Sequence, residues 1–204
     1  MDNEVKYQEI DQQFRPRIRR YMARMAGEHE ADDLTQEVLL KVSKALDAFR
    51  GDARVSTWIY RIATNAALDR LRSRSFQDGI RTTSLDDDET EKVVSIEFIG
   101  HGTSSSRIDE NLVQKEMNSC IRNIVMDLPV DHRTVLILSE FEGLANREIA
   151  AILQTSLETV KIRLHRAKKK LKKELESHCS FYRNDRNDLC CDRKTPPADE
   201  KISS

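Results

Sequence analysis

The first part of the chain repeats apolar positions with the period of amphipathic helices. Residues 5–27 predict one helix that ends at Gly27, a favourable C-terminal cap, and Pro16 is expected to start or kink its main part. A second helix is predicted over 32–48, where apolar residues recur at spacings of four, four, four and three: Leu34, Val38, Val42, Leu46 and Phe49. The segment 49–54 breaks this pattern. A third helix is predicted over 56–74, with six residues on its buried side: Trp58, Ile59, Ile62, Ala63, Ala66 and Leu71.

The second part of the chain begins with a loss of period over residues 75–110, which are acidic and then rich in Ser and Gly, as in flexible linkers. Helical period returns at 112–126 and continues in predicted helices at 131–141, 146–153 and 157–176. The sequence therefore predicts an all-α protein. Its expected parts are a helical domain over 1–80, a flexible acidic linker over 81–111, a second helical domain over 112–176, and a cysteine-containing tail over 177–204.

Charge is sorted along the chain, although the net charge is only −1. Residues 82–110 contain eight acidic and two basic residues, whereas residues 161–173 contain eight basic residues and no acid. Such a basic helix favours a nucleic-acid partner. The first ten residues lack the apolar stretch of a signal peptide, and no apolar run approaches membrane-spanning length, so we expect a cytoplasmic protein without membrane insertion.

Residues 144–171 predict a helix-turn-helix. Asn146 and Ser156 are suitable N-caps for its two helices. The inward face of the second helix is predicted to carry Leu157, Val160, Leu164, Ala167 and Leu171. The DNA-facing residues are predicted to be Glu158, Thr159, Lys161, Ile162, His165, Arg166 and Lys169. We expect Ile162 to touch a thymine methyl group, because an exposed isoleucine on a basic face does not help solubility. The alternative is a solvated basic helix.

Residues 31–74 resemble region 2 of the extracytoplasmic-function (ECF) sigma factors, the short members of the sigma-70 family. The matching elements are DDLTQEV, FRGDA and STWIYRIATNAALDRLR in the first domain, and EIAAIL and TVKIRLHRA in the second. They follow the family order. The resemblance implies a non-enzymatic transcription initiation factor that brings core RNA polymerase to selected promoters, and it leads us to expect an anti-sigma factor as a further partner.

The resemblance also implies roles for individual residues. The predicted helix over 32–48 would dock on the clamp helices of the largest polymerase subunit through Asp32, Asp33, Gln36 and Glu37. The second domain would read the −35 promoter element. Recognition and melting of the −10 element, with one base flipped into a pocket, would involve Phe49, Arg50, Gly51, Asp52, Trp58, Arg61, Ile62, Asn65, Arg70, Arg72 and Arg74.

Several of these implied residues have a structural alternative. Phe49 and Trp58 are also common core residues, whereas Tyr60 is expected to add a stacking surface. We favour a DNA role for Asn65, because an unpaired amide buried on an apolar helix would be costly.

The sequence departs from the family pattern in the second domain. Gln154 and Glu158 stand where the family often has glycine, and Ile162 stands where it often has a small polar residue. Gln154 would be strained if the turn needs a left-handed residue. Glu158 places a negative charge on the DNA face, so the promoter preference of relatives should not be transferred to this chain.

The tail carries four donors that suit zinc or copper(I): His178, Cys179, Cys190 and Cys191. Their spacing is not that of a zinc finger, but some sigma factors of this class have cysteine-rich extensions that sense metals. Two interpretations stay open, a metal or redox sensor and an unstructured tail that bears thiols. Cys120 is expected to be a small buried hydrophobic residue. No other cofactor is expected.

Three other classes of protein fit the sequence less well. An ordinary helix-turn-helix regulator leaves DDLTQEV and FRGDA unexplained. An anti-sigma or adaptor protein does not need a basic recognition helix. For an enzyme we find no nucleotide-binding glycine loop, nucleophile–base pair or catalytic metal signature outside the tail.

Overall fold

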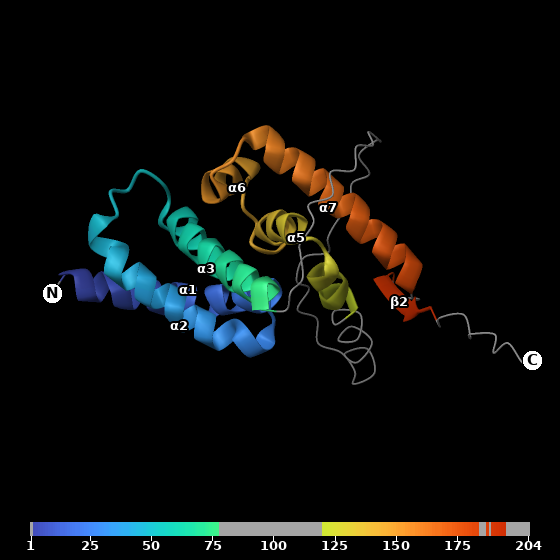
Figure 1. The fold of residues 1–204 in the computed structure, drawn as a ribbon, viewed down its shortest axis with the longest axis horizontal. Helices are drawn as coiled ribbons and strands as arrows, with labels where there is room; N and C mark the ends of the chain where they lie inside the picture. Colours follow the sequence, from blue (N-terminus) through green and yellow to red (C-terminus); the bar gives the residue numbers. More distant parts are fainter. Residues whose placement is uncertain (1, 78–119, 184–186, 188, 195–204) are drawn as a thin grey trace, which may run out of the picture.

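The computed structural model describes residues 2–77, 120–183, 187 and 189–194. Its N-terminal half contains α1 (Asp2–Ala26), α2 (Glu28–Ala45), the 3-10 turn η1 (Leu46–Ala48) and α3 (Val55–Gln77). Its C-terminal half contains a helical segment over 120–127, α5 (Val130–Leu136), the π-helical turn η2 (Ile137–Phe141), α6 (Asn146–Leu153), α7 (Leu157–His178), and the antiparallel strands β1 (Cys179–Arg183) and β2 (Leu189–Arg193). Figure 1 shows the two halves side by side.

The predicted all-α class is confirmed, and the predicted helices are present with shifted ends. α1 runs through Pro16, so this proline does not start a new helix. Gly27 lies between α1 and α2 with a φ of 101°, and its N–H donates to the carbonyl of Ala23 over 3.1 Å, as expected for a glycine cap. The predicted linker and the beginning of the predicted helix at 112–126 lie outside the described residues.

The core of the N-terminal half is formed where α1 crosses α2 and α3. Its fully buried side chains include Ile18, Met22, Leu34, Val38, Ile59 and Ala63. Tyr21 lies at the centre, with its ring edge-on to Tyr60 at 5.4 Å between centroids. The Tyr21 hydroxyl shares a 2.8 Å hydrogen bond with the Thr64 hydroxyl, and burial raises the pKa of this phenol. A buried hydroxyl pair therefore fixes α1 against α3.

The core of the C-terminal half is formed by α5, η2, α6 and α7. Val160, Ala167 and Leu171 are buried as predicted, and Leu157 and Leu164 are half-buried. The predicted cap at Ser156 is confirmed, because its hydroxyl accepts the N–H of Thr159 over 3.0 Å. The predicted cap at Asn146 is wrong. The capping residue is Ala145, whose N–H donates to the carboxylate of Glu148 over 2.9 Å, so this glutamate replaces the expected asparagine.

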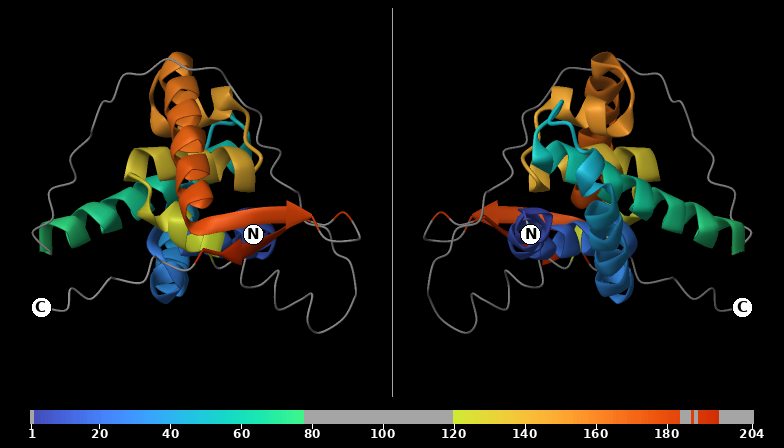
Figure 2. Two further views of the ribbon diagram at one scale, coloured as in Figure 1. Left: turned by 90° about the vertical axis from the view of Figure 1, so that its right-hand side faces the viewer. Right: turned by 90° about the vertical axis from the view of Figure 1, so that its left-hand side faces the viewer.

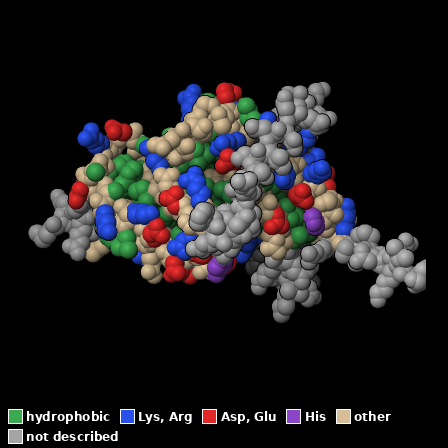
Figure 3. All heavy atoms as spheres, in the orientation of Figure 1, with side chains coloured by type: hydrophobic (Ala, Val, Ile, Leu, Met, Phe, Trp, Pro, Cys, Tyr) green, Lys and Arg blue, Asp and Glu red, His purple; other side chains and the backbone are tan. Residues whose placement is uncertain are grey.

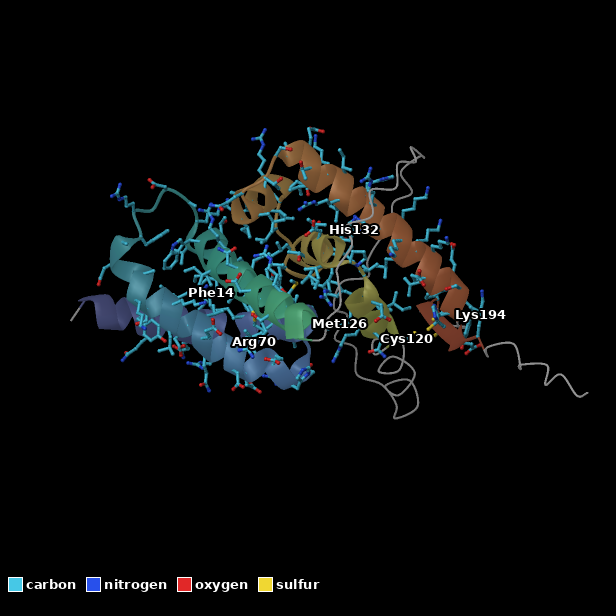
Figure 4. All side chains as sticks on the ribbon, viewed as in Figure 1. Phe14, Arg70, Cys120, Met126, His132 and Lys194 are labelled. Atoms are coloured by element: carbon cyan, nitrogen blue, oxygen red, sulfur yellow. The ribbon has the colours of Figure 1, made fainter. Side chains whose placement is uncertain are left out.

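Arg133 connects α5 to the segment 120–127. It is only 5% exposed, and its Nη1 donates to the carbonyl of Met126 over 2.8 Å. A guanidinium at this position satisfies a carbonyl at the end of a helix and complements the helix dipole. Figure 4 labels Met126 on the segment 120–127.

The two halves pack against each other through α3 and α6, as the views in Figures 1 and 2 show. Glu142, directly after η2, has a side chain that is only 5% exposed. Its carboxylate accepts hydrogen bonds from Arg24 Nη1 at 3.1 Å and from the Tyr60 hydroxyl. Arg61 Nη2 donates to the carbonyl of Ala151 over 2.7 Å. Among the described residues, a buried carboxylate of one half therefore takes its hydrogen bonds from the other.

The Tyr21–Thr64 pair gives a test of the N-terminal core. We expect Tyr21→Phe to lower the free energy of unfolding by about 1–2 kcal/mol, because the Thr64 hydroxyl is left buried without its partner. Replacing both residues, in Tyr21→Phe/Thr64→Val, should cost less than the sum of the two single changes. Urea unfolding of the three variants measures this, and strictly additive losses would contradict the pairing.

Glu142 gives a test of the contact between the halves. We expect Glu142→Ala to weaken this contact by about 2 kcal/mol, since Arg24 and Tyr60 lose a buried acceptor. The radius of gyration measured by small-angle X-ray scattering should rise. The matched control is Glu140→Ala, because Glu140 pairs with Lys168 of its own half at 2.9 Å. An equal change in both variants would argue against a specific role for Glu142.

Candidate nucleic-acid interface

The helix-turn-helix is formed by α6, a tight turn and α7. Gln154 adopts the left-handed conformation in this turn, with φ 51° and ψ 45°. The N–H of Thr155 donates to the carbonyl of Ala150 over 3.1 Å and closes the turn. The predicted strain at Gln154 is thus confirmed, at a cost of about 1 kcal/mol relative to glycine. The turn directs the start of α7 outward from the body of the protein.

α7 is fixed from behind by two ion pairs. Arg163 contacts Asp131 of α5 at 2.9 Å, and Lys168 contacts Glu140 of η2 at 2.9 Å. Two of the eight basic residues in 161–173, Arg163 and Lys168, therefore hold the helix in place and do not face outward. Basic side chains also recur along the outer edge of the molecule where α7 lies (Figure 3).

The outer face of α7 carries the residues predicted to read DNA. Ile162 is 50% exposed, and Glu158, Lys161 and Lys169 are exposed. His165 and Arg166 are half-buried. The ammonium of Lys161 lies 2.9 Å from the Glu158 carboxylate, so a neighbouring positive charge offsets the negative charge on the predicted DNA face. Thr159 is half-buried, and its hydroxyl lies 2.8 Å from that of Ser156, so this residue completes the helix cap.

The predicted −10 loop and the first turn of α3 together present two aromatic rings. Phe49 and Trp58 lie with centroids 4.9 Å apart and planes tilted by 37°, and both are half-buried. Trp58 also packs on the core, so its position agrees with both interpretations of this residue. Arg50, Gly51 and Asp52 are exposed beside the pair, and Gly51 has a φ of 79°. The loop can therefore offer an apolar surface next to exposed polar groups.

α3 carries the other residues predicted to contact the −10 element. Ile62 is half-buried, whereas Asn65 is exposed, so the predicted burial of its amide is wrong. The prediction for Tyr60 was also wrong, because this ring is 2% exposed. Arg61 is turned toward α6, as described above.

The arginines at the end of α3 differ in their partners. Arg70 lies 2.8 Å from Glu30 and 3.8 Å from Glu37, where Figure 4 shows it beside α2. Arg72 lies 3.5 Å from Asp69. The side chain of Arg74 lies outside the described residues.

The outer face of α2 carries the residues implied to bind polymerase. Asp33 and Gln36 are exposed. Asp32 accepts a 2.8 Å hydrogen bond from Arg19 Nε, an interaction that raises the pKa of this guanidinium. Glu37 lies 2.7 Å from Lys41 as well as near Arg70. Two of the four implied residues therefore also make ion pairs within the protein.

Sequence reasoning missed Leu40, which is 59% exposed on the same helix. The periodicity of the helix could have identified it. Leu34, Val38 and Val42 lie on the buried face, so Leu40 falls on the opposite, exposed face. Together with Asp33 and Gln36, Leu40 forms a stripe at helical spacing, and we call these three residues the α2 stripe.

The tail contains a hairpin that the sequence analysis did not predict. In its register, Cys179 lies opposite Arg193 and Cys191 opposite Phe181. Side chains alternate along a strand, so Cys190 and Cys191 point to opposite faces. His178 Nδ1 lies 2.8 Å from the carbonyl of Glu174, within its own helix.

These positions do not support the predicted metal site at His178, Cys179, Cys190 and Cys191. Within the described part of the chain, no group of three or more His, Cys, Asp or Glu side chains is arranged to hold a metal ion. Cys120 is half-buried, less than expected, with its sulfur 3.5 Å from that of Cys179. None of the described helices is both long and apolar enough to span a membrane.

Two solved structures share the fold of this chain. The sigma factor RpoE of Bartonella quintana, solved with the anti-sigma factor NepR, is 20% identical with a TM-score of 0.61, over 84% of this chain and 97% of the other. CnrH, solved with the cytosolic domain of CnrY, is 22% identical with a TM-score of 0.56, over 85% and 90%. At these identities the likeness shows the fold alone.

Sequence relatives show the family. The family model for Sigma-70 region 2 matches residues 10–77, and that for Sigma-70 region 4 matches residues 118–171. The RNA polymerase sigma-H factor of Pseudomonas aeruginosa is 34% identical over 72% of this chain and 74% of its own length. The ECF RNA polymerase sigma factor SigW of Bacillus subtilis and the ECF RNA polymerase sigma-E factor of Escherichia coli are each 30% identical, over 79% and 80% of this chain and 84% and 83% of their own. The chain therefore belongs to the ECF subfamily of the sigma-70 family of RNA polymerase sigma factors.

Proposed function

We propose that this protein binds core RNA polymerase and directs initiation at selected promoters, with the N-terminal half at the −10 element and the C-terminal half at the −35 element. The observation that carries the proposal is the outer face of α7. There Ile162 is 50% exposed on a helix fixed from behind by the Arg163–Asp131 and Lys168–Glu140 pairs. An aliphatic side chain that points outward among basic side chains suits a major groove. There the aliphatic group can contact base edges and the basic groups can contact phosphates.

The −10 contacts would come from the loop and α3. The Phe49–Trp58 pair offers an aromatic surface for an unstacked base, and the exposed amide of Asn65 offers a donor and an acceptor for its edge. Arg50 and Arg72 are exposed and suit phosphates. The function thus rests on one aromatic pair and one amide, with basic residues that position the strand.

The polymerase contact would come from the α2 stripe. Leu40 is the exposed apolar residue of this stripe, and Asp33 and Gln36 lie beside it. A regulator that binds only duplex DNA has no use for this surface. The stripe is therefore the feature that favours a polymerase-bound initiation factor over an ordinary helix-turn-helix regulator.

The contact between the halves bears on how the promoter would be reached. Arg61, one of the implied −10 residues, binds the backbone of α6, and its buried neighbour Tyr60 binds Glu142, so this part of α3 faces the C-terminal half. We propose that the halves separate when polymerase and promoter bind, since the two promoter elements lie about two helical turns apart. An anti-sigma factor would act on the closed form. The structural relative RpoE, solved with the anti-sigma factor NepR, supports this choice of partner.

The proposed function is tested by run-off transcription with core polymerase on a pool of promoter templates with varied −35 and −10 sequences. We expect the protein to confer initiation on a subset of templates that share two sequence blocks. Leu40→Ser should lower the affinity for core polymerase about tenfold and change the unfolding temperature little, because the Leu40 side chain is 59% exposed. Failure to select any template would contradict the proposal.

Ile162 provides a test of base reading. We expect Ile162→Ser to change preference at a single −35 position by about fivefold, the scale of one lost base contact. Lys169→Ala should weaken binding on all templates and reduce the salt slope by about one. Binding measured across the template pool separates these effects. A uniform loss for Ile162→Ser would show that this residue reads no base.

A further inference from the structure

Three cysteine side chains meet at the end of α7, where the hairpin and the segment 120–127 come together. The sulfurs of Cys120 and Cys179 lie 3.5 Å apart. Cys191 lies on the same face of the hairpin as Cys179 and makes a hydrogen bond with it. Figure 4 shows Cys120 near this end of α7. The N–H of Lys194 donates to the carbonyl of His178 over 2.8 Å, which holds the hairpin against the helix.

We infer that Cys120 and Cys179 form a dithiol that hydroperoxides oxidise to a disulfide, a modification site that joins the two ends of the C-terminal half. The two sulfurs are in contact, and a disulfide of about 2 Å needs only a small rotation of each side chain. Cys120 is half-buried, whereas Cys179 is 3% exposed, so an oxidant reaches Cys120 first. This inference is independent of the proposed promoter function.

The reaction takes two steps. The thiolate of Cys120 attacks one oxygen of the hydroperoxide, the O–O bond breaks, and hydroxide or alkoxide leaves and takes up a proton. The sulfur of Cys179 then attacks the resulting sulfenic acid, the S–O bond breaks, and water leaves with the Cys179 proton. Two thiols and one hydrogen peroxide thus become one disulfide and two waters, with the sulfurs oxidised and the peroxide reduced.

The geometry favours Cys120 over Cys191 as the partner of Cys179. Cys179 and Cys191 are diagonal neighbours in the register of the hairpin, since they lie opposite Arg193 and Phe181. Diagonal Cα atoms in a sheet are about 7–8 Å apart, so the two thiols can meet in a hydrogen bond, but a disulfide between them would require the strands to move. Burial also raises the pKa of the Cys191 thiol, which leaves less thiolate to react.

The disulfide would close a loop that contains α5, α6 and α7. It would lower the entropy of the unfolded C-terminal half, and we expect its unfolding temperature to rise by about 5–10 °C. The recognition helix would be held in the same fold in the oxidised and reduced forms, with its far end tied to the segment 120–127.

The inference is tested on the full chain by treatment with one equivalent of hydrogen peroxide, followed by alkylation, tryptic digestion and mass spectrometry. Trypsin places the cysteines in three peptides, 116–122, 174–183 and 187–193. We expect a link between 116–122 and 174–183, reversed by dithiothreitol. A link between 174–183 and 187–193 as the main product, links between two chains, or no link would each overturn the inference.

Matched variants complete the test. Cys120→Ser and Cys179→Ser should each abolish the link, and Cys190→Ser should retain it, because Cys190 points to the other face of the hairpin. The variant Cys190→Ser/Cys191→Ser retains both reacting thiols and should still form the link, so the result does not depend on the folding of the single serine variants. In urea, which unfolds the chain, oxidation should link the cysteine peptides without preference. The same preference for the Cys120–Cys179 disulfide in urea would show that the fold does not direct its formation.

Discussion

The carboxylate of Glu142 lies between the two halves, and the hydrogen bonds that it accepts among the described residues come from the N-terminal half. Arg24 and Tyr60 supply its partners across the interface, and its side chain is 5% exposed. Burying a carboxylate is costly unless it is paired and hydrogen-bonded. The close packing of α3 on α6 therefore depends on this one charge being satisfied. Burial lowers the pKa of Arg24, and the Glu142 charge counters that shift.

The position of Glu142 follows from the π-helical turn before it. In η2 the N–H of Glu142 reaches back five residues to the carbonyl of Ile137, at 3.1 Å. The extra residue in this turn changes the direction in which the following side chains point. The carboxylate of Glu142 therefore points toward Arg24 of α1 and Tyr60 of α3. π-helical turns are rare and often occur at functional sites. Here the turn connects the start of the helix-turn-helix to the N-terminal half.

The sequence predicted what local periodicity encodes. Val160, Ala167 and Leu171 were placed correctly because one helix buries one face, and Ser156 because capping is a local interaction. Contacts between distant residues were missed, since Tyr60 and Arg24 lie 82 and 118 positions from Glu142. The hairpin was missed because its first strand does not alternate buried and exposed residues: in β1 Cys179 is buried and the four residues after it are exposed.

The character of the interface suits a reversible closed form. Buried apolar residues of both halves belong to one cluster, so separation exposes apolar area and the closed form is favoured in isolation. The polar groups behave differently: when Glu142, Arg24 and Tyr60 separate, water replaces the hydrogen bonds that each loses. A partner that separates the halves then has to offset only the free energy of exposing apolar area. The exposed side chains of Leu40 and Ile162 offer such a partner apolar area to bury. A fully apolar interface of the same size would resist opening more strongly.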